Sequence, residues 1–230
     1  TSGYMVDPGA AGAVLGVLER VLARTIDLSD LDDKAQEIDR ITQQLHEADA
    51  YGNHGLWVAN VGDLKGNELP TEFFLDYAWT PQAWPLERLP DYARQWSAQQ
   101  FGPEHAEEIA TILDTYTRFN SRRKPELLAP TTYSLTDYRE AERVVAEYNA
   151  LAKKAEALYE QQPDAYRDAY YQLVLFPVQA SANLNALFVT VGENRLYAAQ
   201  GRAATNAMAE KARTLFARDA ELTRTYHEDL

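Results

Sequence analysis

The sequence contains no cysteine among its 230 residues. Disulfides, thiolate metal ligands and a cysteine nucleophile are therefore excluded. Positive charge is also scarce, because 22 Lys and Arg residues stand against 35 Asp and Glu residues and the formal net charge is -13. A chain with this excess of negative charge repels phosphate backbones and anionic lipid. We therefore expect neither a nucleic-acid partner nor a membrane-surface role.

Long apolar runs and the common metal and nucleotide motifs are missing as well. No run approaches the roughly 18 apolar residues of a membrane span. No G-x-S-x-G elbow, P-loop or dinucleotide fingerprint occurs, so hydride and nucleotide chemistry are not expected. No pair of histidines has the i, i+4 spacing with a carboxylate that zinc proteases use. We expect no metal and no cofactor, and the histidines concerned are His46, His54, His105 and His227.

The stretch that is rich in information runs over residues 56–79. It begins with an apolar run, residues 56–61, and continues into a polar turn, residues 62–68. A short buried strand with polar groups at its C-terminal end is how α/β barrels present ligand-binding chemistry. A helix over residues 30–51, ended by Gly52, precedes the run, so residues 30–61 read as one αβ step. A single strand cannot satisfy its own backbone groups. It either pairs with a segment outside this sequence or lies on the helices as extended chain.

The rest of the sequence predicts helices. Asp7 and Pro8 are a capping pair for a first helix that runs to about Ile26. From Pro70 onward, spacing, prolines and glycines predict helices over residues 71–78, 90–101, 103–124, 137–161, 164–200 and 203–228, with an extended connector at Pro81 and Pro85.

Two of these helices predict how the others pack. The helix over residues 137–161 has a seven-residue apolar repeat, which is typical of shallow-angle bundles. The helix over residues 164–200 is apolar most of the way round and is expected at the centre, with a kink near Pro177. The predicted fold is mainly α, an antiparallel helical bundle with a small αβ remnant of a TIM-type barrel on its N-terminal side. The predicted domains are residues 1–80 and 81–230.

Carboxylates gather around the end of the predicted strand. Asp63, Glu68, Glu72 and Asp76 lie close in sequence, with Asn60, Lys65 and Asn67 among them. Glycoside hydrolysis needs a pair of carboxyl groups with hydrogen-bonding neighbours. The alternative is a turn followed by a solvated helix, because Asp and Asn favour turns.

Two further groups of side chains allow a functional and a structural interpretation. The aromatic residues after the turn either form the floor of a sugar site or anchor the loop to a helical body; they are Phe73, Phe74, Tyr77, Trp79 and Trp84. The basic residues at the end of the 103–124 helix either bind an anion such as a uronate or end the helix in solvent; they are Arg118, Arg122, Arg123 and Lys124.

The ordered blocks VGDLKGNELPTEFFLDYAWTPQAWPLERL, RQWSAQQFG, YTRFNSRRKPELL, SLTDYREAERVV, AYYQLVLFPVQASANLN and NRLYAAQGRAATNAMA resemble glycoside hydrolase family 115, the xylan α-1,2-glucuronidases. The resemblance covers residues 56–230. It implies an inverting hydrolase that removes glucuronic acid or its 4-O-methyl ether from xylan side chains, with a TIM barrel followed by a helical bundle. Secretion or a periplasmic location is also implied. Family enzymes are several times longer, so we expect a fragment of such an enzyme that is inactive alone.

The resemblance also implies roles for single residues. Asn60 and Asp63 would bond sugar hydroxyls, Lys65 would meet the uronate carboxylate, and Tyr77 would contact the substrate. Asp63 and Glu68 are the local candidates for catalysis, and the general acid and base are otherwise not assigned. The rival hypothesis is a non-catalytic helical interaction or oligomerisation domain. A glucuronoxylan-type saccharide is the expected partner, and a second copy of the chain is a further candidate.

Overall fold

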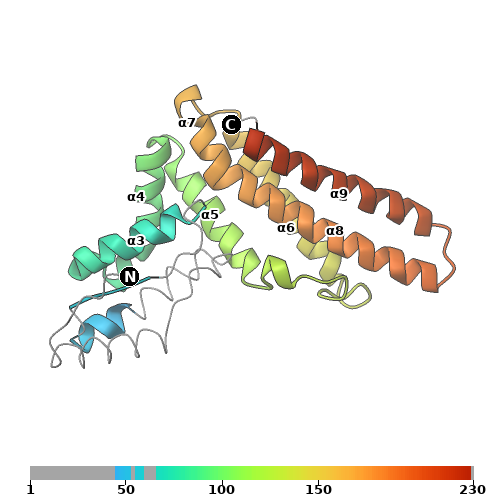
Figure 1. Ribbon diagram of the computed structural model, residues 1–230, viewed down its shortest axis with the longest axis horizontal. Coiled ribbons are helices and arrows are strands. Elements are labelled where there is room, and N and C mark those ends of the chain that lie inside the picture. Colours follow the sequence, from blue (N-terminus) through green and yellow to red (C-terminus); the bar gives the residue numbers. More distant parts are fainter. Residues whose placement is uncertain (1–44, 53–54, 60–65, 229–230) are drawn as a thin grey trace, which may run out of the picture. The chain divides into compact units, whose positions relative to one another are not determined.

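The computed structural model describes residues 45–52, 55–59 and 66–228 (Figure 1). These residues are mainly helical and include no strand. They divide into two compact units, with the boundary between Pro90 and Asp91. A mainly α fold with a helical bundle is therefore confirmed. The helix expected near the N-terminus, residues 8–26, lies outside the described residues.

The first unit is organised by helix α3, Glu68–Trp79. Its buried side chains Leu69, Phe73 and Tyr77 repeat every four residues and form one apolar stripe. The helix begins three residues earlier than expected. Pro70 falls within its first turn, where the missing N–H costs no intrahelical hydrogen bond. Two 3-10 turns follow, η2 (Pro81–Ala83) and η3 (Leu86–Arg88), where the sequence predicted an extended connector.

The chain before α3 is only partly as expected. Residues 45–50 are helical, and Gly52 with a φ of 79° follows them, as predicted for a glycine that ends a helix. The described part of the predicted strand, residues 56–59, belongs to neither helix nor strand. A strand needs a neighbour that pairs with its backbone, and the described residues supply none. The predicted barrel remnant is thus not found in the part of the chain that the structure describes.

The second unit is a helical bundle. Its helices are α4 (Leu89–Phe101, which begins at the junction), α5 (Ala106–Asn120), α6 (Glu140–Tyr159), α7 (Asp164–Tyr170), α8 (Phe176–Ala199) and α9 (Thr205–Glu228), with a 3-10 turn η4 (Pro125–Leu127). Gly102 directly follows α4 and has a φ of 86°. Gly201 lies between α8 and α9 and has a φ of 66°. These left-handed conformations suit glycine and allow the chain to reverse.

Helix α8 lies at the centre of the bundle. It contacts both α6 and α9, and the three helices run side by side in Figure 1. Val178, Ala182, Ala186 and Val189 are among its buried residues. The predicted central position is confirmed. The stretch Asp164–Ala199 is long and apolar enough to cross a membrane by composition, but half of its most apolar window is buried inside the protein, as the core helix of a bundle requires.

The predicted irregularity near Pro177 takes the form of a π-helical turn. Residues Tyr171–Leu175 (η5) connect α7 to α8, and the N–H of Phe176 bonds to the carbonyl of Tyr171, five residues back. Pro177 has no N–H to donate, and in a regular helix its ring would clash with the carbonyl of Leu173. The wider π turn accommodates the proline without ending the helix.

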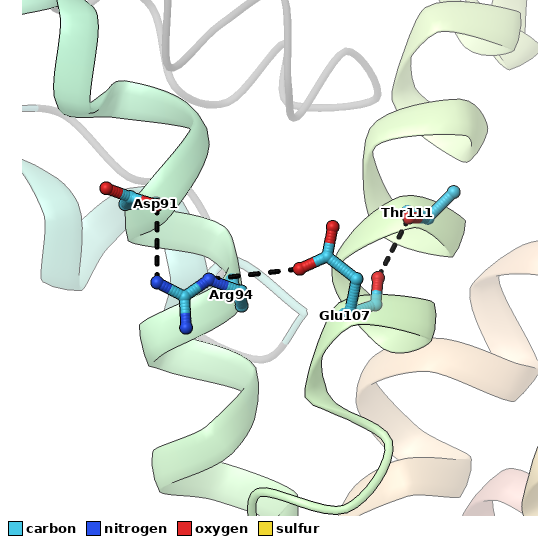
Figure 2. A network of polar contacts seen from close by, with 4 residues as sticks. All are labelled: Asp91, Arg94, Glu107 and Thr111. Atoms are coloured by element: carbon cyan, nitrogen blue, oxygen red, sulfur yellow. Dashed lines mark hydrogen bonds and ion pairs between the residues drawn. The ribbon is translucent and has the colours of Figure 1, made fainter.

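Helices α4 and α5 are joined at their surface by Arg94 (Figure 2). Its guanidinium lies 3.2 Å from Asp91 Oδ1 on α4 and 3.8 Å from Glu107 Oε2 on α5. Thr111 Oγ1 donates to the carbonyl of Glu107 at 2.8 Å. All three charged side chains are largely exposed, so these ion pairs contribute little to stability.

A buried polar chain links α5, α6 and α8. The Tyr148 hydroxyl donates to Asn120 Oδ1 at 2.7 Å, and Asn120 Nδ2 donates to Ser181 Oγ at 3.4 Å. Tyr170 donates to the carbonyl of Ala155 at 3.0 Å. Burial raises the pKa of both Tyr148 and Tyr170 far above the usual value of a tyrosine. Each of these hydroxyls therefore stays protonated in the folded protein at alkaline pH.

These two tyrosines predict a loss of stability at high pH. Because the folded pKa is raised, their contribution is fully present below about pH 10 and is lost as the pH rises further, when unfolding releases the protons. Each tyrosine then lowers the free energy of unfolding by up to about 1.4 kcal/mol per pH unit. Urea unfolding at pH 9, 10 and 11 measures the slope.

Replacing Tyr148 by Phe removes one of the two ionising groups. The free energy of unfolding should then fall less steeply with pH, by up to about 1.4 kcal/mol per pH unit. Tyr138→Phe is the matched control, because Tyr138 is 92% exposed and should leave the slope unchanged. An equal slope in the wild-type protein and the Tyr148→Phe variant would show that Tyr148 ionises as easily in the folded state as in the unfolded state.

Candidate functional site

The site predicted at the strand end is only partly described. Asn60, Asp63 and Lys65 lie outside the described residues. Glu68 is the first residue of α3, and Tyr77 lies in its last turn. The structure therefore places the second half of the predicted site on one helix.

Tyr77 belongs to the core of the first unit. It is 1% exposed, and its ring stacks on that of Trp57 with the centroids 6.2 Å apart. The ring of Phe73 is a second neighbour, and its centroid lies 5.9 Å from that of the Tyr77 ring. Burial raises the pKa of the Tyr77 hydroxyl, and the charge of Asp49 adds to this effect. Tyr77 thus holds the chain around Trp57 against α3.

The other aromatic residues differ in exposure. Phe73 and Phe74 are buried, as the interpretation of a loop anchored to a helical body requires, whereas Trp79 is 90% exposed. Trp84 lies below the guanidinium of Arg88, 5.3 Å from the ring centroid. Trp79 is therefore the aromatic side chain of this group that presents a free face.

The carboxylates of α3 form a row. Glu68, Glu72 and Asp76 are spaced four residues apart, so they lie on one side of the helix. A glycosidase pair must act on opposite sides of the scissile bond, at about 5 to 10 Å, and one helix face approaches from a single side. In the described ranges, no group of three or more His, Asp or Glu side chains could hold a metal ion.

A cavity of about 670 Å³ lies in the second unit, where α5 ends and α6 begins. Two of the four basic residues singled out in the sequence, Arg122 and Arg123, line it together with Arg143 of α6. The walls also carry hydroxyl groups, apolar groups and two carboxylates; these residues are Leu127, Ala129, Thr131, Thr132, Tyr133, Glu140, Val144 and Glu147. We call it the arginine cavity.

The loop that walls the arginine cavity is fixed by local hydrogen bonds. Ser134 Oγ accepts from the N–H of Asp137 at 2.9 Å, and Ser134 N–H donates to Glu140 Oε2 at 2.7 Å. The N–H of Ala141 donates to the carbonyl of Ser134 at 3.1 Å. Tyr138 and Arg139 both have a φ of 53°, a left-handed conformation that is unusual for residues other than glycine. The loop thus enters α6 in a strained but well-bonded form.

A glycine on α8 lets the same loop approach the bundle. A Cβ atom at Gly192 would lie 2.5 Å from the carbonyl oxygen of Pro130. Leu128 and Tyr133, on either side of Pro130, are buried in a cluster with Val144 and Tyr148. The position of the loop is therefore determined by packing against α6 and α8.

The three arginines of the cavity differ in their partners. Arg122 forms an ion pair with Glu147 at 2.5 Å and lies over the ring of Phe119, 4.4 Å from its centroid. Arg123 Nε donates to the carbonyl of Leu127 at 3.1 Å. The guanidinium of Arg143 makes no hydrogen bond or ion pair with the described part of the chain. The sequence interpretation missed Arg143 and Tyr133. A helical pattern indicates that an arginine such as Arg143 is exposed, but it does not show that the loop with Tyr133 lies beside it.

Comparison with known proteins gives two findings. The sequence profile of "Glycosyl hydrolase family 115" matches residues 32–127. Among solved structures, the fold matches a family GH115 4-O-methyl-alpha-glucuronidase, BtGH115A, described as specific for decorated arabinogalactans, with a TM-score of 0.65 and 25% sequence identity. The match covers 80% of this chain and 25% of that one, so this chain spans about a quarter of that structure. Comparison with curated proteins gives no match.

Replacing Tyr77 should separate its packing role from its hydroxyl. Tyr77→Ala removes a buried ring and should lower the free energy of unfolding of the first unit by about 3 to 5 kcal/mol. Tyr77→Phe keeps the ring, so the cost should stay under about 1.5 kcal/mol. Trp57 fluorescence in a chain whose other tryptophans are replaced by Phe would follow this unfolding. Equal costs for the two variants would contradict a packing role.

Gly192→Ala should destabilise the second unit although alanine is the better helix former. The helix gains about 1 kcal/mol, but the new methyl group meets a backbone carbonyl, and such overpacking costs about 1 to 3 kcal/mol. Urea unfolding should show a net loss. Gly55→Ala is the control, since nothing lies within 4 Å of its Cβ position. A stability gain at Gly192 would show that the loop is free to move away.

Proposed function

Because the chain is similar to glycosyl hydrolase family 115 in sequence and in fold, we propose that it is part of a longer carbohydrate-active hydrolase. The proposed reaction is inverting hydrolysis that removes glucuronic acid or its 4-O-methyl ether from xylan side chains. The observation that carries the proposal is the family match over residues 32–127, which includes the whole 56–79 stretch and the SRRKPEL segment. The glucuronidase name of the structural neighbour supports the same sugar.

The proposal divides the chain into two functional parts. Residues 1–80 would end a catalytic barrel with the polar loop 56–69, and residues 81–230 would form the helical domain that follows it. In this arrangement Asn60 and Asp63 bond sugar hydroxyls, and Lys65 meets the uronate carboxylate. The row of carboxylates on α3 approaches from one side only, so Glu68, Glu72 and Asp76 can supply at most one member of the catalytic pair. The other member belongs to further strands of the barrel.

Tyr77 has a different place in this proposal. A residue that is 1% exposed offers no surface to a sugar, but its stack on Trp57 fixes the chain that leads into the polar loop. We therefore propose that Tyr77 acts by positioning this chain. Trp79, which is 90% exposed, is the aromatic ring of α3 that could stack on a sugar.

The 230-residue chain by itself should release no glucuronic acid from aldouronic acids. A glycosidase needs two carboxyl groups held about 5 to 10 Å apart with the sugar between them, and in this proposal the second belongs to barrel strands outside the 230-residue chain. Incubation of the purified chain with aldouronic acids, followed by chromatography of the products, measures this. Turnover above the buffer control would refute the fragment hypothesis.

In the longer enzyme, Lys65→Met should lower kcat/KM on a glucuronosyl substrate by about tenfold to a few hundredfold. The loss corresponds to a charge-assisted hydrogen bond of roughly 1.5 to 3 kcal/mol, at 1.4 kcal/mol for each factor of ten. Kinetics on the uronate and on its carboxyl-reduced glucosyl counterpart should show the loss for the uronate alone. Lys211→Met, an exposed lysine of α9, is the control.

Two outcomes would remove Lys65 from the site. One is an equal loss on both substrates, which would indicate a general disturbance of the loop. The other is a lowered melting temperature with unchanged kinetics, which would indicate that Lys65 stabilises a local turn or pairs with Asp63 or Glu68.

The second candidate function is a non-catalytic interaction or oligomerisation domain. Helix α9 favours it, since Leu222 is its buried residue and Phe216 on the same helix is 69% exposed. A dimer formed through α9 would cover that ring. Light scattering of the wild-type chain and of Phe216→Ser tests this candidate, because a dimer that is lost in the variant would assign α9 to association, whereas a monomeric wild-type chain would contradict it.

A further inference from the structure

The arginine cavity is separate in sequence from the polar loop that carries the proposed sugar contacts. All eleven of its lining residues lie between Arg122 and Glu147, and this segment belongs to the second unit. It therefore forms without any residue of the 56–79 stretch. A volume of about 670 Å³ is within the range of small-molecule sites.

The charge of the cavity is opposite to that of the chain. Three arginines and two glutamates line it, which leaves one net positive charge in a chain whose net charge is -13. Both glutamates are engaged: Glu147 pairs with Arg122, and Glu140 Oε2 accepts the N–H of Ser134. The positive charge that a ligand meets is thus carried by Arg123 and Arg143, with Glu140 as the carboxylate that opposes an anion.

Guanidinium groups recognise flat, two-oxygen anions especially well. A guanidinium presents parallel N–H donors that match the two oxygens of a carboxylate. Arg123 uses its Nε on the Leu127 carbonyl, which fixes the stem of the side chain and leaves the terminal nitrogens as donors. The guanidinium of Arg143 has no partner in the described part of the chain, and the backbone N–H of this residue is bonded to the carbonyl of Arg139. Two arginines in one cavity, with few competing acceptors, favour an anionic ligand.

The remaining wall suits a polyhydroxylated molecule. Thr131, Thr132 and Tyr133 are the hydroxyl-bearing residues of the lining, and Leu127, Ala129 and Val144 add apolar surface. Thr132 Oγ1 accepts the N–H of Ala129 at 2.8 Å, so this hydroxyl keeps a proton to donate. The Tyr133 side chain is 8% exposed, and its hydroxyl has no hydrogen-bond partner in the structure. Burial raises the pKa of Tyr133, while the charge of Arg122 lowers it and that of Glu140 raises it; these charges therefore lie close to the hydroxyl.

We infer that the arginine cavity binds the carboxylate of an acidic sugar, with Arg123 and Arg143 holding the carboxylate and the threonine side of the wall facing the hydroxyl groups. The choice of an acidic sugar among carboxylates rests on the proposed function, whereas the anion preference rests on the cavity alone. No bond is made or broken in this step. The cavity is a binding site of the helical domain, in addition to the catalytic site of the longer enzyme.

Isothermal titration calorimetry of the 230-residue chain tests the inference. The probes are sodium D-glucuronate, D-glucose, which has the same ring without the carboxylate, and inorganic phosphate. Glucuronate should bind, glucose should bind at least tenfold more weakly, and phosphate should not bind more tightly than glucuronate. Raising sodium chloride from 20 to 200 mM should weaken the binding of glucuronate, because salt screens a partly exposed ion pair.

Variants assign the binding to the two arginines. Arg143→Gln should weaken glucuronate binding about tenfold, the scale of one charge-assisted hydrogen bond, and Arg123→Gln should do the same. Arg143→Lys keeps the positive charge but lacks the paired N–H donors of the guanidinium. It should therefore bind glucuronate more tightly than Arg143→Gln and more weakly than the wild type. Arg213→Gln is the matched control, since Arg213 lies on α9 and pairs with Glu210. Thermal unfolding of Arg143→Gln should match the wild type, because that side chain has no partner to lose.

Three results would overturn the inference: no heat with glucuronate, equal affinity for glucose, or unchanged affinity in both Arg143→Gln and Arg123→Gln. Tighter binding of phosphate than of glucuronate would also overturn it in favour of an inorganic anion site. These outcomes are independent of catalysis. Hydrolysis by the longer enzyme and its dependence on Lys65 can stand when the cavity binds nothing, and the cavity can bind glucuronate when the longer enzyme does not hydrolyse it.

Discussion

The burial of α8 is the constraint on which the second unit depends. This helix is apolar around most of its circumference, so it needs α6 and α9 on its sides to remove that surface from water. The Tyr148, Asn120 and Ser181 hydrogen bonds then allow only one register between α5, α6 and α8, because a shift would leave buried polar groups without partners. Apolar burial drives the association, and the polar chain specifies it.

The same core builds the arginine cavity. The loop before α6 is held against α8 where Gly192 leaves room for the carbonyl of Pro130, and Leu128 and Tyr133 fasten its two sides. The end of α5 and the start of α6 then face each other across the loop and bring Arg123 and Arg143 to one cavity. The charged surface is thus a consequence of apolar packing beneath it.

The sequence predicted the elements whose signals are local. Spacing, prolines and glycines placed the helices from Pro70 onward to within a few residues. Near Pro177 the sequence predicted a kink, and the structure has a π-helical turn directly before that residue. The strand predicted over residues 56–61 could not be judged locally, because a strand exists only with a partner, and the described residues 56–59 form none. The arginine cavity depends on contact between Gly192 and Pro130, which are far apart in the chain, so periodicity could show Arg122 and Arg123 but not their meeting with Arg143 and Tyr133. Of the predicted sugar contacts, Asn60, Asp63 and Lys65 lie outside the described residues.

The sequence is similar to glycosyl hydrolase family 115, and the second unit is a helical bundle for which we propose an anion-binding cavity. We propose that the longer protein hydrolyses α-linked glucuronosyl side chains with inversion. Proton NMR of the first product formed from glucuronoxylan oligosaccharides tests it most directly, because the anomeric signal is read before mutarotation mixes the two forms. With inversion, β-glucuronic acid or its 4-O-methyl ether should appear first. Inversion would be contradicted if the α-anomer appeared first. The proposed hydrolysis would be contradicted if the complete protein released no acidic sugar from the oligosaccharides.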